Sequence, residues 1–187
     1  MAPSTNDQED FLLSCRYGDL DDVKQFIDSF GAAAAAGIHD DNGNTPLHML
    51  CGNGHVDVLD YLLPIIPPSM LSAQNDAKST PLHWAALNSH LGVVKKLVEF
   101  PGGPGVDLID IKNAAGRSPL GEAELAGWDE GAQWLVQMMK LDPGDVKEGE
   151  GDETNEGEDV SVGPEGVDIE IEDADGQMAK MRIDGRS

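Results

Sequence analysis

Apolar residues recur at helical spacing on one side of two short segments, residues 56–63 and 93–98, which is the pattern of amphipathic helices. A shorter apolar segment precedes each of them, at 46–51 and 81–87. Between the two members of each pair lies a stretch of Gly, Asn, Ser and His residues that ends a helix, and a proline follows each pair. The pattern therefore predicts two helix-turn-helix units of the same construction.

One tetrapeptide marks the start of each unit. Thr45-Pro46-Leu47-His48 returns 35 residues later as Thr80-Pro81-Leu82-His83, and a degenerate copy follows as Ser118-Pro119-Leu120-Gly121. Threonine is suited to cap a helix through its hydroxyl, proline fits the first helical position, and the leucine begins the buried stripe. A period close to ~33 residues with this start is identified as the ankyrin repeat, in which a β-turn precedes two helices.

Two further units lack the full signature. Residues 11–27 keep the glycine turn and the amphipathic outer helix without the Thr-Pro start, and residues 118–139 repeat the plan with a more polar inner helix. Terminal repeats of a stack expose one face to water and are atypical for that reason. We predict an all-α repeat solenoid over residues 7–140, an ankyrin array of about four repeats with two degenerate caps. Its extra length is expected in loops at 31–37, 65–68 and 101–105.

Charge is distributed unevenly along the chain. The sequence has 35 acidic and 12 basic residues, a formal net charge of −23, and residues 141–187 hold 16 of the acidic and 4 of the basic ones. Residues 141–166 are mostly Gly, Glu and Asp with almost nothing to bury, so we expect an acidic, largely disordered linker there. Because this charge repels phosphates, the expected partner is a basic protein, and direct binding of nucleic acid is not expected.

Residues 167–187 differ from the linker. Apolar and charged residues alternate over 167–172 and again over 179–183, on either side of the turn sequence Asp173-Ala174-Asp175-Gly176, which is typical of a β-hairpin. An isolated hairpin is marginal in water. We expect this segment to dock on the array or on a partner, or to fold only when bound; a disordered tail with accidental alternation is the alternative.

No recognisable catalytic, metal or cofactor site stands out in the sequence. It has no phosphate-binding glycine loop, no Cys-x-x-Cys pair and no nucleophile beside an evident base. His48 and His83 are expected to hydrogen-bond the backbone between neighbouring repeats, and Cys15 and Cys51 to be buried, reduced thiols. We therefore expect a protein that is not an enzyme and that uses no cofactor or metal.

The chain has no run of the ~18 apolar residues that a membrane helix needs. Residues 1–7 contain neither a basic region nor an apolar core of the kind found in secretory signals. These features predict a cytoplasmic and nuclear location without a membrane partner.

The binding surface can be placed from the repeat plan. In an ankyrin stack the turn tips and the inner helices line the concave side, so the candidate contacts are residues there that the core does not claim. Trp84 either packs between inner helices or is a partly exposed anchor of the kind that dominates interfaces. Such a surface, with several carboxylates, few positive charges and some apolar area, suits a basic amphipathic helix. The candidate partner-binding residues are Arg16, Tyr17, Asp40, Asp41, Asn42, Asn44, Asp76, Trp84, Leu87, Asn88 and Glu122.

Several stretches together resemble one family. The segments Gly18-Asp19-Leu20-Asp21, Leu82-His83-Trp84-Ala85-Ala86-Leu87-Asn88 and Glu122-Ala123-Glu124, with the acidic tail, are similar to the small fungal ankyrin-repeat chaperones dedicated to ribosomal protein S-three of the small subunit. The resemblance implies a dedicated chaperone in ribosome biogenesis. Such a chaperone is a monomer that binds an N-terminal helical segment of the newly made basic ribosomal protein in a one-to-one complex. It shields that protein until assembly.

Two other functions fit the same features. One is an ankyrin adaptor in proteasome assembly or transcription-factor binding. The other is a general acidic chaperone for basic proteins. They differ from a dedicated chaperone in the preferred ligand and in the salt dependence of binding.

Overall fold

The computed structural model describes residues 2–141, 167–172 and 178–183. Chain packing divides the protein into two compact units, residues 1–146 and 147–187. The first is an all-α repeat solenoid, as predicted. Its inner helices are α1 (Thr5–Tyr17), α4 (Pro46–Asn53), α6 (Pro81–Leu87) and α9 (Pro119–Leu125), and its outer helices are α2 (Leu20–Phe30), α5 (Val56–Leu62), α7 (Leu91–Val98) and α10 (Asp129–Leu141).

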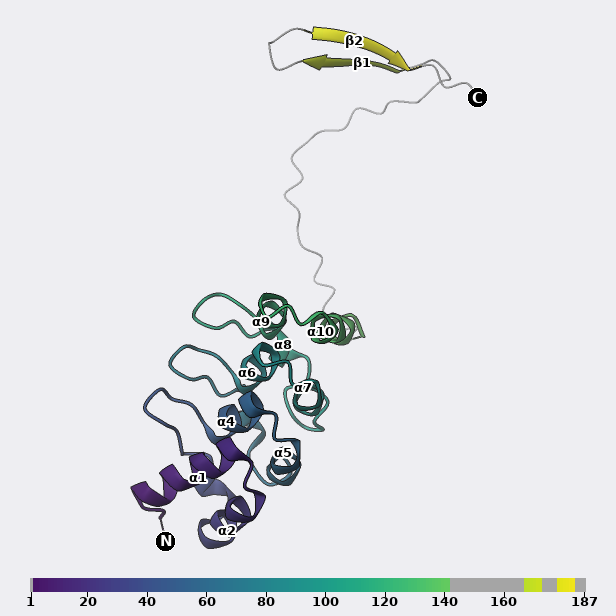
Figure 1. Ribbon diagram of the computed structural model, residues 1–187. Helices are drawn as coiled ribbons and strands as arrows, with labels where there is room; N and C mark the ends of the chain where they lie inside the picture. Colours follow the sequence, from purple (N-terminus) through teal and green to yellow (C-terminus); the bar gives the residue numbers. More distant parts are fainter. Residues whose placement is uncertain (1, 142–166, 173–177, 184–187) are drawn as a thin grey trace. The chain divides into compact units, whose positions relative to one another are not determined.

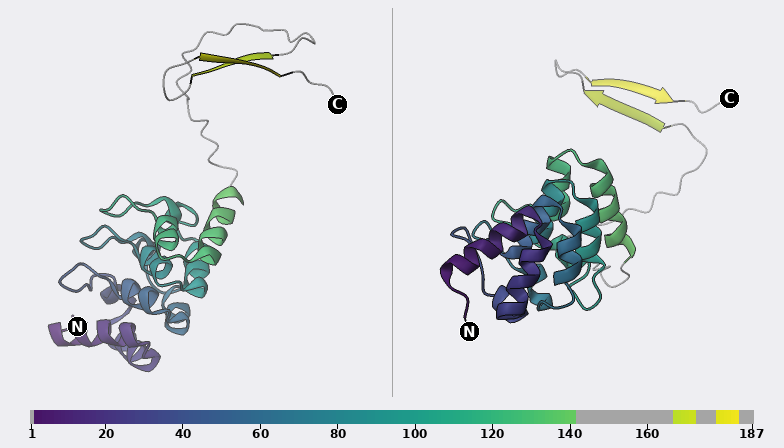
Figure 2. Two further views of the ribbon diagram at one scale, coloured as in Figure 1. Left: turned by 45° about the horizontal axis from the view of Figure 1, so that its top comes forward. Right: turned by 60° about the horizontal axis from the view of Figure 1, so that its bottom comes forward.

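Three layers make up the solenoid (Figures 1 and 2). The inner helices pack on one another in the order α1, α4, α6 and α9, and each outer helix packs on the inner helix of its own repeat. The loops that connect successive repeats project from the inner helices on the side away from the outer helices. These loops, called the finger loops below, and the inner helices together border one side of the array.

The apolar helix faces predicted from the sequence form a continuous buried core. Leu47, Leu82, Val58 and Val93 are completely buried, as are the cysteines Cys15 and Cys51, and both cysteines are free thiols. Complete burial of one such aliphatic side chain stabilises a fold by about 1.5–3 kcal/mol. Because each repeat buries its apolar side chains against the next one, the inner helices are held in a fixed order.

His48 and His83 join neighbouring repeats, as predicted. Thr45 and Thr80 are the N-caps of α4 and α6, and each forms a capping box with the histidine three residues later. Nδ1 of His48 accepts a hydrogen bond from the Thr45 N–H (3.1 Å), and its Nε2–H donates to the Ser79 carbonyl of the next finger loop (2.8 Å). His83 repeats this geometry with Thr80 (3.1 Å) and with the Arg117 carbonyl (3.0 Å).

The hydrogen bonds of the two histidines fix the form of their rings. Since Nδ1 accepts and Nε2 donates, each ring is the neutral Nε2–H tautomer. Burial lowers the pKa of His48 and of His83, and this effect exceeds the opposing hydrogen bonds to the Ser79 and Arg117 carbonyls. Both rings therefore remain neutral at physiological pH.

The finger loops are built on one repeated turn. Oδ1 of Asp40 accepts hydrogen bonds from the N–H groups of Asn42 (2.9 Å) and Asn44 (2.8 Å). Oδ1 of Asn75 accepts one from the Ser79 N–H (2.9 Å), and Asn113 makes the same contacts in the third loop. Such short polar side chains can satisfy turn backbone locally. The Asp76 N–H also donates to the Asn42 carbonyl (3.0 Å), so the first two loops are joined to each other.

The structure differs from the sequence prediction at the ends and in the insertions. Helix α1 begins at Thr5, earlier than the predicted unit, because Ser4 and Asp7 form a capping box. Short helices occupy part of the predicted loop at residues 31–37 and follow the predicted loops at 65–68 and 101–105. They are α3 (Ala32–Ala35), the 3₁₀ helix η1 (Pro68–Ser72) and α8 (Asp107–Asp110).

The second unit contains two strands, β1 (Val167–Glu172) and β2 (Met178–Ile183). They pair antiparallel with Asp168 opposite Arg182 and Glu170 opposite Lys180, which is the register that opposite charges across a strand pair favour. The acidic linker predicted at 141–166 lies outside the described residues, apart from Leu141.

Candidate functional site: a concave groove

A groove lies between the finger loops and the inner helices. Its volume is about 400 Å³, within the range of ligand-binding pockets. Residues of the first finger loop form one wall, and the ends of α1, α4 and α6 form the other. This concave groove is lined by Arg16, Asp40, Asn42, Asn44, Met49, Gly52, Asn53, Trp84 and Asn88.

Trp84 is both packed and accessible, so the two alternatives weighed from the sequence are both partly correct. Its ring meets the buried His48 ring edge-on, with 5.7 Å between ring centroids. It also lies across Gly52, where a Cβ atom would come within 2.7 Å of Trp84 Cε3. The remaining face is open to the groove, because Trp84 is only partly buried. A half-exposed tryptophan that is fixed by packing is a typical interface anchor.

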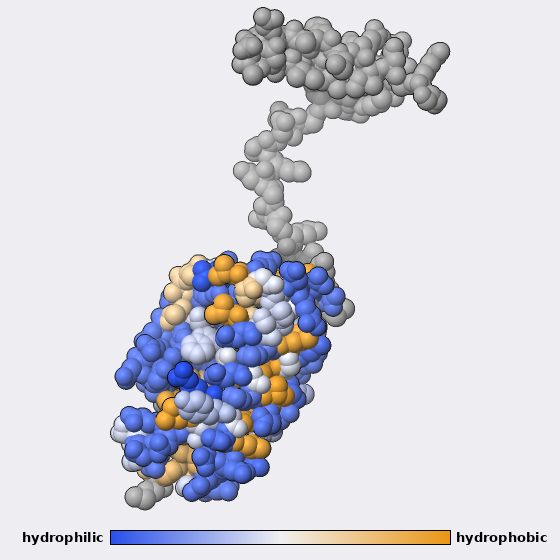
Figure 3. Space-filling model, viewed as in Figure 1, coloured by the Kyte–Doolittle hydropathy of each residue, from blue (hydrophilic) through white to orange (hydrophobic). Residues whose placement is uncertain are grey.

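Exposed apolar side chains continue from the groove along the inner helices. Four of the six large hydrophobic residues exposed in the described part of the chain lie there: Leu13 (47 % exposed), Tyr17 (67 %), Leu87 (47 %) and Leu125 (65 %). We call these four the apolar stripe. Figure 3 shows hydrophobic patches on this side of the array, near α1 and over α9, within a mostly hydrophilic surface. The four residues lie on three of the inner helices, α1, α6 and α9, and such an arrangement is suited to an elongated apolar ligand.

Negative charge is concentrated towards the α1 end of the array. Residues 1–45 carry 9 acidic and 2 basic side chains, whereas residues 46–140 carry 10 and 6. In the first finger loop Asp41 is exposed and Asp40 is half-buried. Burial raises the pKa of Asp40, but hydrogen bonds from Asn44 and Asn42 outweigh that effect and lower it overall. This loop therefore presents ionised carboxylates beside the groove.

Several basic side chains are held on the outer helices. Lys96 of α7 pairs with Asp60 of α5 at 2.5 Å. Lys95 lies over the Trp134 ring and Lys24 over the Tyr61 ring, 5.9 and 5.8 Å from the ring centroids. These three cations are not among the residues that line the concave groove; of the lining residues in the described part of the chain, Arg16 alone is basic.

The structure brings six of the eleven predicted contact residues together in the concave groove. Tyr17 and Leu87 belong to the apolar stripe, and Asp41 and Asp76 are exposed on the finger loops. The six in the groove are Arg16, Asp40, Asn42, Asn44, Trp84 and Asn88.

For two of the predicted contacts, Asn44 and Glu122, the side chain is buried in the array and not free as the sequence suggested. Asn44 is only 6 % exposed, because its amide donates to Asp40 (2.8 Å) and its Oδ1 accepts from Asn75 (2.7 Å). Glu122 is only 5 % exposed, and its Oε1 accepts from Asn113 (2.6 Å) and from Arg117 Nε (3.0 Å). Both side chains stabilise finger loops through these hydrogen bonds.

Sequence reasoning missed Met49 and Leu13. Met49 lines the groove and Leu13 belongs to the apolar stripe. Leu13 lies as many residues before Asp19, and Met49 as many before His55, as Trp84 lies before His90. Asp19, His55 and His90 are the corresponding turn residues of their repeats. Aligning the repeats from their turns would have found them; searching for polar residues did not.

Comparisons with known proteins agree with the repeat fold. Residues 11–110, more than half of the chain, match the family described as ankyrin repeats (3 copies). The chain belongs to the ankyrin-repeat family. The array is similar to an ankyrin repeat-containing protein of Schizosaccharomyces pombe, P16F5.05c, with 36 % identity over 119 residues, which are 64 % of this chain and 77 % of that protein.

A solved structure extends the likeness to almost the whole ankyrin array. It is the crystal structure of the yeast ribosomal protein Rps3 in complex with its chaperone Yar1. The match has a TM-score of 0.68 and 27 % sequence identity, and it covers 76 % of this chain and 99 % of the matched chain.

Within residues 2–141, 167–172 and 178–183, no group of three or more His, Cys, Asp or Glu side chains is arranged to hold a metal ion. None of the helices in that part of the chain combines the length and apolar composition that crossing a membrane requires.

Proposed function

We propose that this protein is a dedicated chaperone for the small-subunit ribosomal protein Rps3 and acts in ribosome biogenesis. The observation that carries the proposal is the likeness to a chain of the Rps3–Yar1 complex, which extends over 99 % of that chain. Because this protein is an ankyrin array, the chaperone is its counterpart in that pair. The same likeness supports a one-to-one complex.

The chemistry of the concave surface supports a basic, amphipathic ligand. Trp84 and the apolar stripe offer apolar contact on α1, α6 and α9, and Asp40 and Asp41 place negative charge at one border. A helix binds such a surface with its apolar side and places Lys or Arg residues against the carboxylates. An N-terminal helical segment of the ribosomal protein is the proposed ligand.

An acidic array would mask the cationic surface of a ribosomal protein and so keep that protein from binding RNA before assembly. Ribosomal RNA presents a phosphate on every nucleotide, and a cationic protein releases many counterions on binding it. The chaperone would therefore lose its ligand to RNA at the assembly site by electrostatic competition, without catalysing a reaction. Because such a ligand passes from synthesis to assembly, the proposal includes a chaperone that acts in the cytoplasm and the nucleus.

A binding panel tests the proposal. The full-length protein is titrated with Rps3 from the same organism and with other ribosomal proteins of similar net charge. We expect Rps3 to bind at least about tenfold more tightly, and Trp84→Ala with Leu87→Ala to weaken binding by about 10- to 100-fold, since buried interface anchors contribute about 1–3 kcal/mol. Equal affinity for every basic protein would indicate a general acidic chaperone, and no affinity for Rps3 would indicate an adaptor for another ligand.

A further inference from the structure

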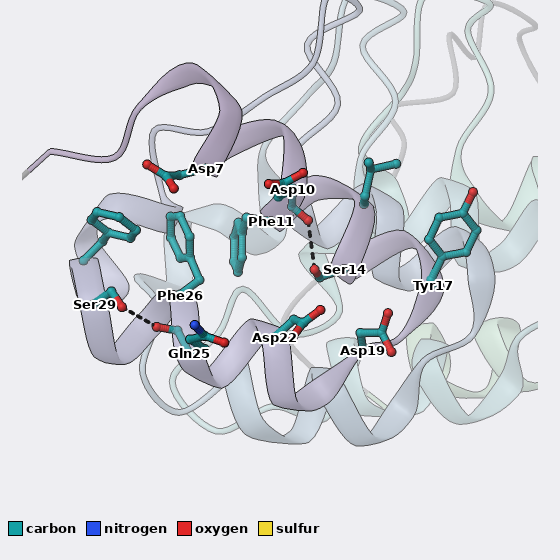
Figure 4. Close-up of a pocket in the computed structure, with 12 residues that line it drawn as sticks. Asp7, Asp10, Phe11, Ser14, Tyr17, Asp19, Asp22, Gln25, Phe26 and Ser29 are labelled. Atoms are coloured by element: carbon teal, nitrogen blue, oxygen red, sulfur yellow. Dashed lines mark hydrogen bonds between the residues drawn. The ribbon is translucent and has the colours of Figure 1, made fainter.

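A second groove lies at the N-terminal end of the array, between α1 and α2. Its volume is about 560 Å³, and Figure 4 shows the residues that line it. Phenylalanine rings lie between the two helices, with Asp7 and Asp10 of α1 on one side and Asp19 and Asp22 of α2 on the other. We call it the N-terminal groove.

Three phenylalanine rings in a row form the floor of the N-terminal groove. Phe11 and Phe26 stack with 4.0 Å between centroids and an interplanar angle of 20°, and Phe30 follows Phe26 at 4.9 Å. Phe11 and Phe26 are almost completely buried, whereas Phe30 is partly open to the groove. Leu13 and Tyr17, both exposed, line the groove as well. Phe30, Leu13 and Tyr17 therefore provide the accessible apolar surface of the groove, and the buried Phe11 and Phe26 rings hold Phe30 in place beneath it.

The rim is charged with one sign. Hydrogen bonds from the Ser4 hydroxyl and the Ser4 N–H lower the pKa of Asp7 and keep it ionised. Asp10 accepts a hydrogen bond from Asn6 (2.8 Å). Among the described residues, the side-chain carboxylates of Asp19 and Asp22 have no hydrogen-bond or ion-pair partner, and the groove has no Lys or Arg in its lining. The four carboxylates thus surround apolar rings without a cation to balance them.

We propose that the N-terminal groove is a second contact site for the same ligand, and that it takes a short basic segment in which Lys or Arg residues flank an apolar residue. This inference rests on the proposed function. Leu13 and Tyr17 belong both to the apolar stripe and to the N-terminal groove. A ligand that lies along the stripe therefore reaches the groove by continuing past the end of α1.

Charge excludes the occupants that the chain itself could supply. A second copy stacked end to end would bring its last repeat, with exposed Glu124, Asp129 and Glu130, against the four carboxylates. The C-terminal region is no better suited, because residues 141–187 carry a net charge of −12. A cationic segment of another protein complements the groove, since opposite potentials across an interface favour association.

A matched pair of charge variants tests the N-terminal groove. Asp19→Asn with Asp22→Asn removes two rim carboxylates at the start of α2. Asp57→Asn with Asp129→Asn removes two exposed carboxylates from the first turns of α5 and α10, so it matches the change in net charge and in helix-end electrostatics. We expect the groove variant to bind Rps3 about 5- to 20-fold more weakly at low salt, with a smaller dependence on salt, and the control to change less than about twofold.

Cross-linking locates the ligand independently of affinity. Gln25 lines the groove and Gln133 lies on α10 at the other end of the array, and both are exposed. Because Cys15 and Cys51 are buried, Gln25→Cys and Gln133→Cys each place a labelling site for a photo-crosslinker on the array. We expect a Lys- or Arg-rich segment of Rps3 to be cross-linked from position 25 and not from position 133.

The outcomes separate the two proposals. If the groove variant binds like the control while Trp84→Ala with Leu87→Ala loses affinity, the second site is refuted and the chaperone function stands. The second site is also refuted if the segment cross-linked from position 25 is acidic or apolar. If the unmodified protein has no preference for Rps3, the proposed function fails before the groove is considered.

Discussion

Replacing His48 by alanine should separate the two halves of the array. His48 is completely buried, and its ring accepts hydrogen bonds at Nδ1 from the N–H and hydroxyl of Thr45 and donates from Nε2 to the Ser79 carbonyl. One ring thus caps α4 in the second repeat and holds the finger loop that begins the third. Alanine makes none of these bonds.

The expected loss follows from those contacts. Each net hydrogen bond contributes about 0.5–1.5 kcal/mol, and removal of a buried ring leaves space that the surroundings fill only partly. The Thr45 hydroxyl keeps its own bond to the backbone N–H of residue 48 in the capping box, so part of the cap survives the substitution. We expect His48→Ala to lower the free energy of unfolding by about 2–4 kcal/mol. His39→Ala, which changes an exposed ring, should cost less than about 0.5 kcal/mol.

Urea denaturation with two probes distinguishes a lost bridge from a general loss of packing. Circular dichroism reports on all helices, whereas the tryptophans Trp84, Trp128 and Trp134 all lie in the third and fourth repeats. In a stack with nearest-neighbour coupling, a weaker contact between the second and third repeats lets the two halves unfold separately. The two transitions should coincide in the unmodified array and diverge in His48→Ala. A loss below about 1 kcal/mol, or a larger loss with coincident transitions, would refute the bridging role.

Three further predictions concern the scaffold. Lowering the pH from 7 to 5 should destabilise the array, because unfolded histidines bind protons below about pH 6.5 whereas burial lowers the pKa of His48 and His83 in the folded array. The stability present above pH 6.5 is therefore lost as the pH falls. Urea midpoints measured at both pH values should show a smaller loss in the double variant His48→Ala with His83→Ala. Gly54→Ala places a Cβ 2.7 Å from His90 Nδ1 at a φ of 78°, whereas the Cβ of Gly127→Ala, at a φ of 67°, meets nothing within 4 Å. Thermal unfolding should show that the free energy of unfolding falls by about 2–3 kcal/mol for Gly54→Ala and by about 1 kcal/mol for Gly127→Ala. Equal losses would contradict the contact with His90. Burial raises the pKa of the Cys15 and Cys51 thiols. A thiol reagent at pH 8 should therefore label neither cysteine in the folded protein and both in urea. Rapid labelling of the folded protein would contradict the burial of the thiols.

The repeated tetrapeptide was sufficient to predict most of the array. Pro46 and Pro81 begin α4 and α6, and the proposed role of the histidines between repeats is confirmed. These features depend on local chemistry, because a cap, a proline and a leucine act within one turn of helix. The insertions were harder to predict, since the short helices α3, η1 and α8 are stabilised by packing against α2, α6 and α9 respectively.

The candidate site was predictable in position but not in the state of each side chain. Asn44 and Glu122 are polar residues at the edge of the concave side, so sequence alone cannot distinguish them from Asn42 or Asn88. Their partners, Asn75 in the next finger loop and Asn113 in the same repeat, decide the matter. The N-terminal groove could not be predicted either, because it depends on how Phe26 and Phe30 of α2 face α1.

The salt dependence of Rps3 binding tests the central claim most directly. The dissociation constant of the full-length protein for Rps3 is measured from 50 mM to 1 M sodium chloride. If an acidic, rigid array receives a cationic ligand, affinity should fall continuously by about 100-fold or more over this range, because screening weakens contacts between exposed charges. Association that stays equally tight at 1 M sodium chloride would contradict the account.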